Sequence, residues 1–162
     1  MKPFRDVTFE DLADLVKTDE KERFCLQQKS ASSSNSGEWR VKANQGHSFD
    51  LDELDLTRIT DARDFPTVIH GTFEGNLASI MESGLSRMSR AYIHFASGLD
   101  AKSGIRKSCD TVIHVNLEMC LEHGIEFWVS PNGVILSKGE EGKGILSPRF
   151  FSKIEKIIKN SI

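Results

Sequence analysis

Basic side chains recur within or beside runs of apolar residues, a setting in which they can bind an anionic ligand. They are Arg23, Arg40, Lys42, Arg90 and Arg106. A guanidinium group is permanently charged and binds phosphate through two parallel hydrogen bonds, so basic groups that converge from several strand ends suit a phosphorylated ligand. Lys21 and Arg23 share one face of an extended chain, because side chains alternate there with a period of two. Any one of these residues alone is better explained as solvated or salt-bridged.

Short polar segments that contain glycine lie close to these basic residues. His70-Gly71-Thr72 ends one apolar run, and Gln45-Gly46-His47-Ser48 forms a polar turn. Glycine allows a ligand to approach the backbone closely. Of the five histidines, His70 and His94 end apolar runs and are compatible with binding, whereas His114 alternates with apolar residues and is better explained as a structural strand residue. These residues predict a cleft for a phosphorylated ligand.

Other chemistries lack their motifs in this sequence. It contains no Glu-x-x-His, His-x-x-x-His or Cys/His cluster, so no metal is expected, and it contains no P-loop or Rossmann glycine fingerprint. The three cysteines are widely spaced and odd in number, which favours reduced thiols inside the cell; they are Cys25, Cys109 and Cys120. A net charge of -3 over 162 residues means that a nucleic-acid partner would need a local basic patch.

Hydropathy gives no indication of a membrane protein. No apolar run approaches the ~18 residues that a membrane span needs. The first residues lack the apolar core of a signal peptide. We therefore expect a cytoplasmic or nuclear protein with no membrane partner, in the form of a monomer.

The pattern of apolar residues predicts an α+β fold of short strands with few helices. Thr8 is expected to cap a helix, a second helix is expected at 76–81 with Gly84 as its left-handed cap, and Ile154, Ile157 and Ile158 indicate a terminal helix. Strands are predicted at 23–27, 39–43, 67–70, 92–95, 111–115, 125–129 and 134–136. The connections are expected to include a hairpin loop at 29–37, a linker within 50–64 and a tight turn at 131–133.

With these segments in view, the chain resembles the RNA 2′-phosphotransferase family over nearly its whole length. The matching segments follow the family's order and lie at 21–24, 41–48, 70–72, 84–90, 93–96, 103–106 and 130–136. One such match could arise by chance, but the ordered set is highly specific.

The resemblance implies a two-lobed protein, with a partial winged-helix-like RNA lobe at 1–60 and an ADP-ribosyltransferase-like, NAD-binding lobe at 61–162. It implies a transferase of tRNA splicing that removes an internal 2′-phosphate from RNA, with NAD as co-substrate and without a metal. The RNA phosphate would displace nicotinamide from NAD, and a neighbouring hydroxyl of the ADP-ribose would then attack that phosphate. The products would be ADP-ribose cyclic phosphate and a plain 2′-hydroxyl.

The same resemblance implies roles for individual residues. Arg23 and Arg90 match catalytic arginines, and Lys21 is a supporting cation. Backbone groups near Gly71 would bond the nicotinamide amide, and His70 would reach the adenosine side. The residues expected to bind NAD are His70, Gly71, Thr72, Gly84, Leu85, His94, Ser103, Gly104 and Arg106. Those expected to bind the RNA substrate are Lys21, Lys42, Gln45, His47 and Ser48.

Some positions depart from the family pattern. The sequence begins at a point that resembles the end of the first lobe, so the Arg-His pair of that lobe is expected to be missing, and by analogy such a loss costs ~10²-fold or more in rate. Lys42 stands where arginine is usual, and Tyr92 stands where histidine is usual. These differences keep two alternatives open: a module that binds NAD or ADP-ribose and RNA with impaired catalysis, and an ADP-ribosyltransferase acting on another phosphate acceptor.

Overall fold

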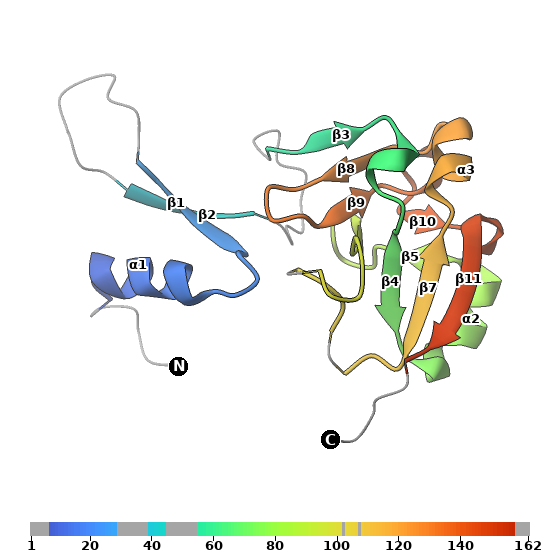
Figure 1. Cartoon of the computed structure of the whole chain (residues 1–162), viewed down its shortest axis with the longest axis horizontal. Helices are drawn as coiled ribbons and strands as arrows, with labels where there is room; N and C mark the ends of the chain where they lie inside the picture. Colours follow the sequence, from blue (N-terminus) through green and yellow to red (C-terminus); the bar gives the residue numbers. More distant parts are fainter. Residues whose placement is uncertain (1–6, 29–38, 45–54, 102, 107, 158–162) are drawn as a thin grey trace.

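The computed structural model describes residues 7–28, 39–44, 55–101, 103–106 and 108–157. In this part of the chain, a small unit (residues 7–44, the N-terminal unit) lies to one side of a larger body (residues 55–157, the main body), as Figure 1 shows. The N-terminal unit consists of helix α1 (Phe9–Thr18) and an antiparallel hairpin of β1 (Phe24–Gln28) and β2 (Trp39–Ala43).

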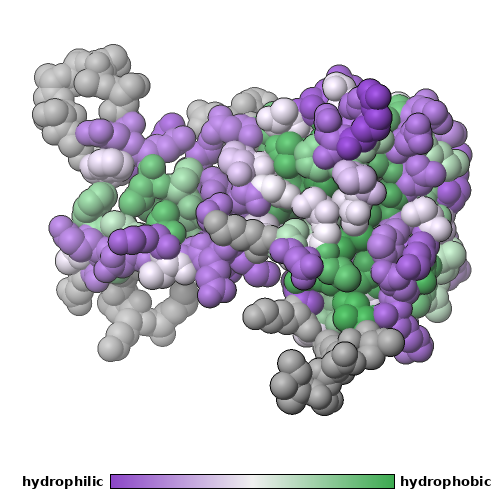
Figure 2. All heavy atoms as spheres, viewed as in Figure 1, coloured by the Kyte–Doolittle hydropathy of each residue, from purple (hydrophilic) through white to green (hydrophobic). Residues whose placement is uncertain are grey.

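Helix α1 begins where the sequence predicts. Thr8 and Asp11 form a capping box, because the Asp11 amide donates to the Thr8 hydroxyl at 3.2 Å and the Thr8 amide donates to the Asp11 carboxylate at 2.9 Å. The helix rests on the hairpin through the Phe9 and Trp39 rings, whose centroids lie 5.4 Å apart. None of the described residues of the N-terminal unit is fully buried. Apolar side chains therefore remain on its surface (Figure 2), among them Phe9, Trp39 and Val41.

The main body is built from short antiparallel strands. The four-stranded sheet has the order β3 (Thr57–Ile59), β8 (Phe127–Val129), β9 (Ile135–Ser137) and β6 (Ile93–Phe95). The three-stranded sheet has the order β11 (Phe151–Lys156), β7 (Thr111–Val115) and β4 (Ile69–Thr72). A pair is formed by β10 (Ile145–Leu146) and β5 (Leu85–Ser86). The two larger sheets meet at an isolated bridge between Ile69 and Ala96.

The helical elements of the main body are short. They are α2 (Leu77–Ser83), α3 (Leu117–Glu122) and the 3-10 turns η2 (Ala62–Asp64), η3 (Glu74–Asn76), η4 (Glu140–Gly142) and η5 (Pro148–Phe150). Both η2 and η5 contact α3, and η5 also contacts α2. The protein thus mixes helices with mostly short strands, as the predicted α+β class requires.

A continuous apolar core lies between these elements. Ile113, Phe127, Ile135, Leu146 and Phe150 are fully buried within it. Each such side chain contributes about 1.5–3 kcal/mol through removal of apolar surface from water. The core thus holds together β6, β7, β8 and β9, the strands that carry or flank the residues of the predicted site.

Most of the predicted strands are confirmed within one or two residues, but the terminal helix is wrong. Residues 151–156 form β11, which pairs with β7. Of the three isoleucines that suggested a helix, Ile154 lies in β11, and Ile157 directly follows it and donates its amide to the Asp110 carbonyl at 2.7 Å. Ile158 lies outside the described residues. The linker predicted at 50–64 is also wrong in its described part, because that part contains β3 and η2. The hairpin loop predicted at 29–37 lies outside the described residues.

Gly133 confirms the predicted tight turn, whereas Gly84 ends α2 as predicted but is not a left-handed cap. Gly133 has φ +77° between β8 and β9, and its amide donates to the Ser130 carbonyl at 2.8 Å. Gly84 ends α2 with φ +87°, a value that favours glycine, but its ψ of 174° is extended and not that of a left-handed helix. A Cβ atom at Gly84 would stand 2.6 Å from the Leu146 carbonyl oxygen, so this corner requires glycine for close packing as well.

Candidate functional site

A cleft of about 670 Å³ brings together most of the predicted site residues. The main body lines it with β4, β6 and the segments 86–90 and 103–106, and the N-terminal unit contributes Lys21 and Arg23. This volume lies within the range of about 300–1,000 Å³ that is typical of small-molecule sites. The cleft is therefore large enough for a nucleotide and open to groups from both parts of the protein.

The described charged side chains that line this cleft are all basic. Its basic lining residues are Lys21, Arg23, Arg87, Arg90 and Arg106, and its described lining includes no Asp or Glu. The chain as a whole has a net charge of -3, so the basic groups are concentrated here against the average. Arg87 was not singled out by sequence reasoning; its guanidinium donates to the Arg90 carbonyl at 2.6 Å and so braces the segment that carries Arg90. Such a lining attracts anionic ligands.

Two neutral histidines form one wall of the cleft. The ring Nδ1 of His70 lies 2.9 Å from the His94 carbonyl, and Nδ1 of His94 lies 3.0 Å from the Tyr92 carbonyl. Because a carbonyl can only accept, each Nδ1 donates, and each Nε2 keeps a free lone pair. Burial, together with the charge of Arg90, lowers the pKa of both rings, that of His94 to about 4. The Nε2 atom of His94 is buried and has no hydrogen-bond partner among the residues that the structure describes.

Close backbone packing explains two of the predicted glycines. A Cβ atom at Gly71 would stand 2.6 Å from Cβ of Ile105, so β4 and the segment 103–106 approach one another only because residue 71 lacks a side chain. A Cβ atom at Gly104 would stand 2.6 Å from the Ala101 carbonyl oxygen. Substitution at either position would push the segment 103–106 away from the cleft wall.

Arg23 reaches the cleft from the N-terminal unit and is held by a carboxylate. Its Nε and Nη2 atoms both donate to Oδ1 of Asp19, at 3.0 and 2.8 Å, and its backbone amide donates to Oδ2. These bonds lower the pKa of Asp19, chiefly through the side-chain hydrogen bond with Arg23. The Arg23 side chain is still 55% exposed, which leaves guanidinium surface available to a ligand.

A contact between the two parts of the protein lies beside this arginine. The Lys21 carbonyl accepts hydrogen bonds from the Ser103 hydroxyl at 2.8 Å and from the Asn132 side-chain amide at 3.1 Å. Ser103 was expected to contact NAD, whereas Asn132 had been assigned no role. The partners are 82 and 111 residues apart, so the sequence carries no local pattern from which this contact could be read.

Other predicted site residues lie elsewhere. Gly84 and Leu85 do not line the cleft, and Leu85 is buried in the core. Lys42 forms an ion pair with Asp55 at 3.0 Å and does not line the cleft either. Tyr92 does line it, but its ring packs in a T-shaped arrangement on Trp128 with centroids 5.9 Å apart. Gln45, His47 and Ser48 lie outside the described residues.

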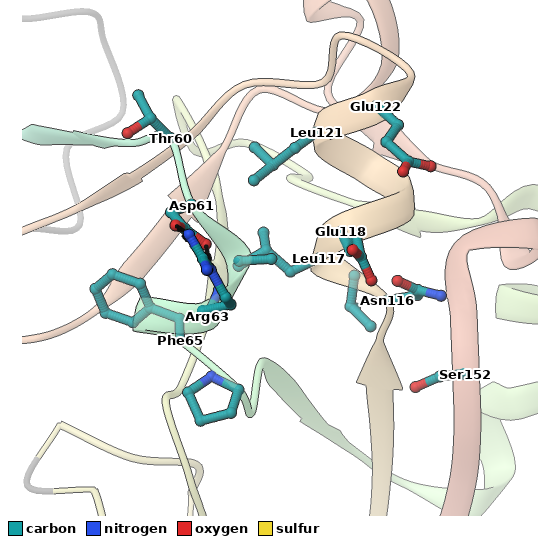
Figure 3. A pocket seen from close by; sticks show the side chains of 13 residues that line it. Thr60, Asp61, Arg63, Phe65, Asn116, Leu117, Glu118, Leu121, Glu122 and Ser152 are labelled. Atoms are coloured by element: carbon teal, nitrogen blue, oxygen red, sulfur yellow. Dashed lines mark hydrogen bonds and ion pairs between the residues drawn. The ribbon is translucent and has the colours of Figure 1, made fainter.

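A second hollow, of about 570 Å³, lies between η2 and α3 (Figure 3). Its lining includes three acidic residues, Asp61, Glu118 and Glu122, and one basic residue, Arg63. Arg63 already pairs with Asp61, and its side-chain hydrogen bond holds the pKa of that carboxyl down to about 2. This hollow therefore lacks the electropositive character of the first cleft and does not suit a phosphorylated ligand.

Neither a metal centre nor a membrane span is found in the part of the chain that the structure describes. Within 7–28, 39–44, 55–101, 103–106 and 108–157, no three His, Cys, Asp or Glu side chains are grouped so as to hold a metal ion. No helix in these ranges has both the length and the apolar character needed to cross a bilayer.

Comparison with known proteins identifies the family of this chain. Residues 1–139 match the model of the "RNA 2'-phosphotransferase, Tpt1 / KptA family", and the chain belongs to that family. It is 39% identical over 155 residues to tRNA 2'-phosphotransferase 1 of Mus musculus, covering 93% of this chain and 60% of the mouse protein. It is 35% identical over 160 residues to tRNA 2'-phosphotransferase 1 of Danio rerio, covering 95% of this chain and 69% of the fish protein.

A relative in Schizosaccharomyces pombe is 38% identical over 156 residues, which are 94% of this chain but 40% of that protein. The chain thus spans between two fifths and about two thirds of the length of these relatives.

Proposed function

We propose that this protein is an NAD-dependent RNA 2′-phosphotransferase that acts on RNA with an internal 2′-phosphate, as at a tRNA splice junction. The observation that carries the proposal is the cleft lined by basic side chains from both parts of the protein, with no Asp or Glu in its described lining. Membership of the family supports it. The reaction joins two phosphorylated substrates, and such a site offsets the repulsion between them.

In this proposal the main body is an ADP-ribosyltransferase-like lobe that binds NAD, and the N-terminal unit is a partial winged-helix-like lobe that binds RNA. The cleft fits a dinucleotide in several respects. The absence of a side chain at Gly71 lets the segment 103–106 pack against β4, which places Ser103 and Arg106 in the cleft lining beside His70. The arginines Arg87, Arg90 and Arg106 match the pyrophosphate.

The first step forms a bond from an oxygen of the RNA 2′-phosphate to the ribose carbon of NAD that carries nicotinamide. The bond from that carbon to nicotinamide breaks, and its electron pair leaves with the neutral base. Arg23, with Lys21 beside it, would hold the attacking phosphate, while Arg90 stabilises charge between the two substrates. Both neutral histidines favour this step, because an imidazolium would compete for the phosphate.

The second step forms a bond from the neighbouring hydroxyl of the ADP-ribose to the same phosphorus. The bond from phosphorus to the RNA 2′ oxygen breaks, and the proton of the attacking hydroxyl passes overall to that oxygen. The products are ADP-ribose cyclic phosphate and an RNA 2′-hydroxyl. Arg23 and Arg90 would stabilise the charge that gathers on the phosphoryl oxygens as both bonds change.

The test is a short RNA with one internal 2′-phosphate, incubated with the protein and NAD and followed for loss of phosphate and release of nicotinamide. Arg23→Ala and Arg90→Ala should each lower turnover by about 10²-fold or more. Arg63→Ala is the matched control, because Arg63 is also paired with a nearby aspartate but lies in the second hollow. Turnover that survives in Arg23→Ala would remove Arg23 from the site.

A second candidate function is a module that binds NAD and RNA without turning them over. The observation in its favour is that the Arg23 guanidinium is engaged by Asp19, at 2.8 and 3.0 Å. The same assay separates the two functions. Saturable NAD binding without nicotinamide release supports the module, and accumulation of ADP-ribosylated RNA supports an enzyme arrested after its first step.

A further inference from the structure

The Lys21 carbonyl is a joint between the N-terminal unit and the main body. It accepts from the Ser103 hydroxyl at 2.8 Å and from the Asn132 side-chain amide at 3.1 Å, which are donors from two separate loops of the main body. Two donors saturate both lone pairs of one carbonyl oxygen. The position of residue 21 is therefore fixed from two directions.

The surroundings of Asn132 hold its side chain in the orientation that this contact needs. It is only 8% exposed, and the Ser130 hydroxyl donates to its Oδ1 atom at 2.7 Å. The Lys21 carbonyl can only accept, so the side-chain atom that faces it is the NH₂ group, and Oδ1 is left to accept from Ser130. Ser130 also accepts from the Val134 amide at 3.1 Å, so the β8–β9 turn holds Asn132 rigidly. Asn132 itself does not line the cleft.

The joint positions Arg23 through a short turn that several hydrogen bonds stabilise. The Glu22 amide donates to the Asp19 carbonyl at 2.8 Å, and the Arg23 amide donates to the Asp19 carboxylate. On the other side, the backbone amide of Asn44 donates to the Arg23 carbonyl at 2.7 Å, and its side chain donates to the Glu22 carbonyl at 2.7 Å. A displacement of Lys21 therefore moves Arg23 with it. Ser103 belongs to the segment that also carries Arg106. The same joint therefore holds Arg23 and Arg106 in a fixed position relative to each other.

We propose that Asn132 is a positioning residue for phosphate transfer, acting through the Lys21 carbonyl to seat Arg23 over the NAD cleft. This inference rests on the proposed function, since it names the residue that aligns the two halves of that site. Asn132 does not touch the substrates; it decides whether the basic turn of the N-terminal unit faces the nucleotide or swings away from it.

The test compares Asn132→Asp with the matched change Asn116→Asp. An aspartate at 132 still accepts from Ser130 but has no hydrogen to donate to Lys21. Asn116 caps α3, where its Oδ1 atom accepts from the Met119 amide at 3.0 Å, a role that aspartate also fills. In the RNA assay, N132D should lower kcat/KM for the RNA about tenfold, the factor that one hydrogen bond supports, with Kd for NAD within about twofold of wild type. N116D should match the wild type.

A second measurement does not depend on activity. Backbone ¹⁵N relaxation gives the rotational correlation time of each part of the protein. In wild type, the amides of β1 and β2 should tumble with those of β4 and β7, and in N132D they should tumble faster. Ser103→Ala removes the other bond to the same carbonyl and should act alike, so it carries this measurement if N132D fails to fold.

The outcomes separate the two levels of the inference. Equal correlation times for both parts in N132D and in Ser103→Ala would overturn the joint. Faster tumbling of β1 and β2 with an unchanged kcat/KM would overturn the positioning role. A wild-type protein without turnover would refute the proposed function and the catalytic part of this inference with it, and the relaxation data alone would then decide whether Asn132 holds the N-terminal unit.

Discussion

Gly71→Ala should disturb the cleft from inside the three-stranded sheet. Gly71 lies in β4 opposite Val112 of β7. An added Cβ atom would stand 2.6 Å from Cβ and 2.8 Å from Cγ2 of Ile105, and 3.2 Å from Sγ of Cys109. The contact with Cβ of Ile105 cannot be relieved by a rotamer change, because a Cβ atom moves only with its backbone. The segment 103–106 must therefore shift.

The size of the effect follows from two opposing contributions. Inserting a methyl group into a packed site costs about 1–3 kcal/mol. Replacing glycine by alanine restricts the unfolded chain and returns about 0.4–1 kcal/mol, since Gly71 has no positive φ that would strain alanine. The net loss in the free energy of unfolding is about 1–2 kcal/mol. For a protein of this length, that corresponds to a fall in Tm of about 3–6 °C.

The assay combines thermal unfolding with a titration of NAD. Gly71→Ala should lower both Tm and the affinity for NAD, because the displaced segment carries Ser103 and Arg106. Gly75→Ala is the matched control: no atom lies within 4 Å of its added Cβ, and its φ is not positive. We expect Gly75→Ala to unfold within about 0.5 kcal/mol of wild type. A Gly71→Ala protein with wild-type Tm and NAD affinity would refute the reasoning.

Three further predictions concern single side chains. His94 has a pKa of about 4 in the folded protein against about 6.5 when unfolded, so the native state binds fewer protons between these values. The free energy of unfolding should therefore fall by about 3 kcal/mol as the pH drops from 6.5 to 4. Urea unfolding of His94→Gln should lack this loss, and an equal pH dependence in variant and wild type would contradict the prediction. Asp19→Asn should reduce turnover severalfold with unchanged NAD affinity, because the Arg23 fork loses its charged partner; full activity would contradict this. Thr8→Ala should cost α1 about 1 kcal/mol, seen as faster amide exchange in α1 but not in β7, and equal exchange would show that the cap contributes nothing.

Much of the fold could be predicted because local chemistry determines it. The capping box at Thr8, the β-branched run of β7 and the glycine turn before β9 each act within a few residues. Helix α3 was missed although Asn116 is a standard N-cap, because the helix has only six residues and a short apolar period. The terminal strand was mistaken for a helix because Ile154 and Ile157 are three residues apart in the sequence, whereas the extended form of residues 151–156 comes from pairing with the distant strand β7.

The candidate site, too, was predictable only where local sequence determines it. Arg23, Arg90, His70 and His94 all line one cleft, as their segments suggested. The hydrogen bonds to the Lys21 carbonyl depend on how the N-terminal unit packs against the main body, which no local pattern in the sequence determines. The low pKa of His94, which keeps the ring neutral down to a pH of about 4, likewise depends on burial that is produced only by the assembled sheet.

The lack of any fully buried residue among the described positions of the N-terminal unit has a thermodynamic consequence. Helix α1 and its hairpin gain little from an interior of their own, so their order depends on docking and on whatever anion bridges them to the main body. A bound polyanion that contacts both parts would stabilise this region by mass action, and its melting temperature would rise with the logarithm of the ligand concentration once that concentration exceeds Kd.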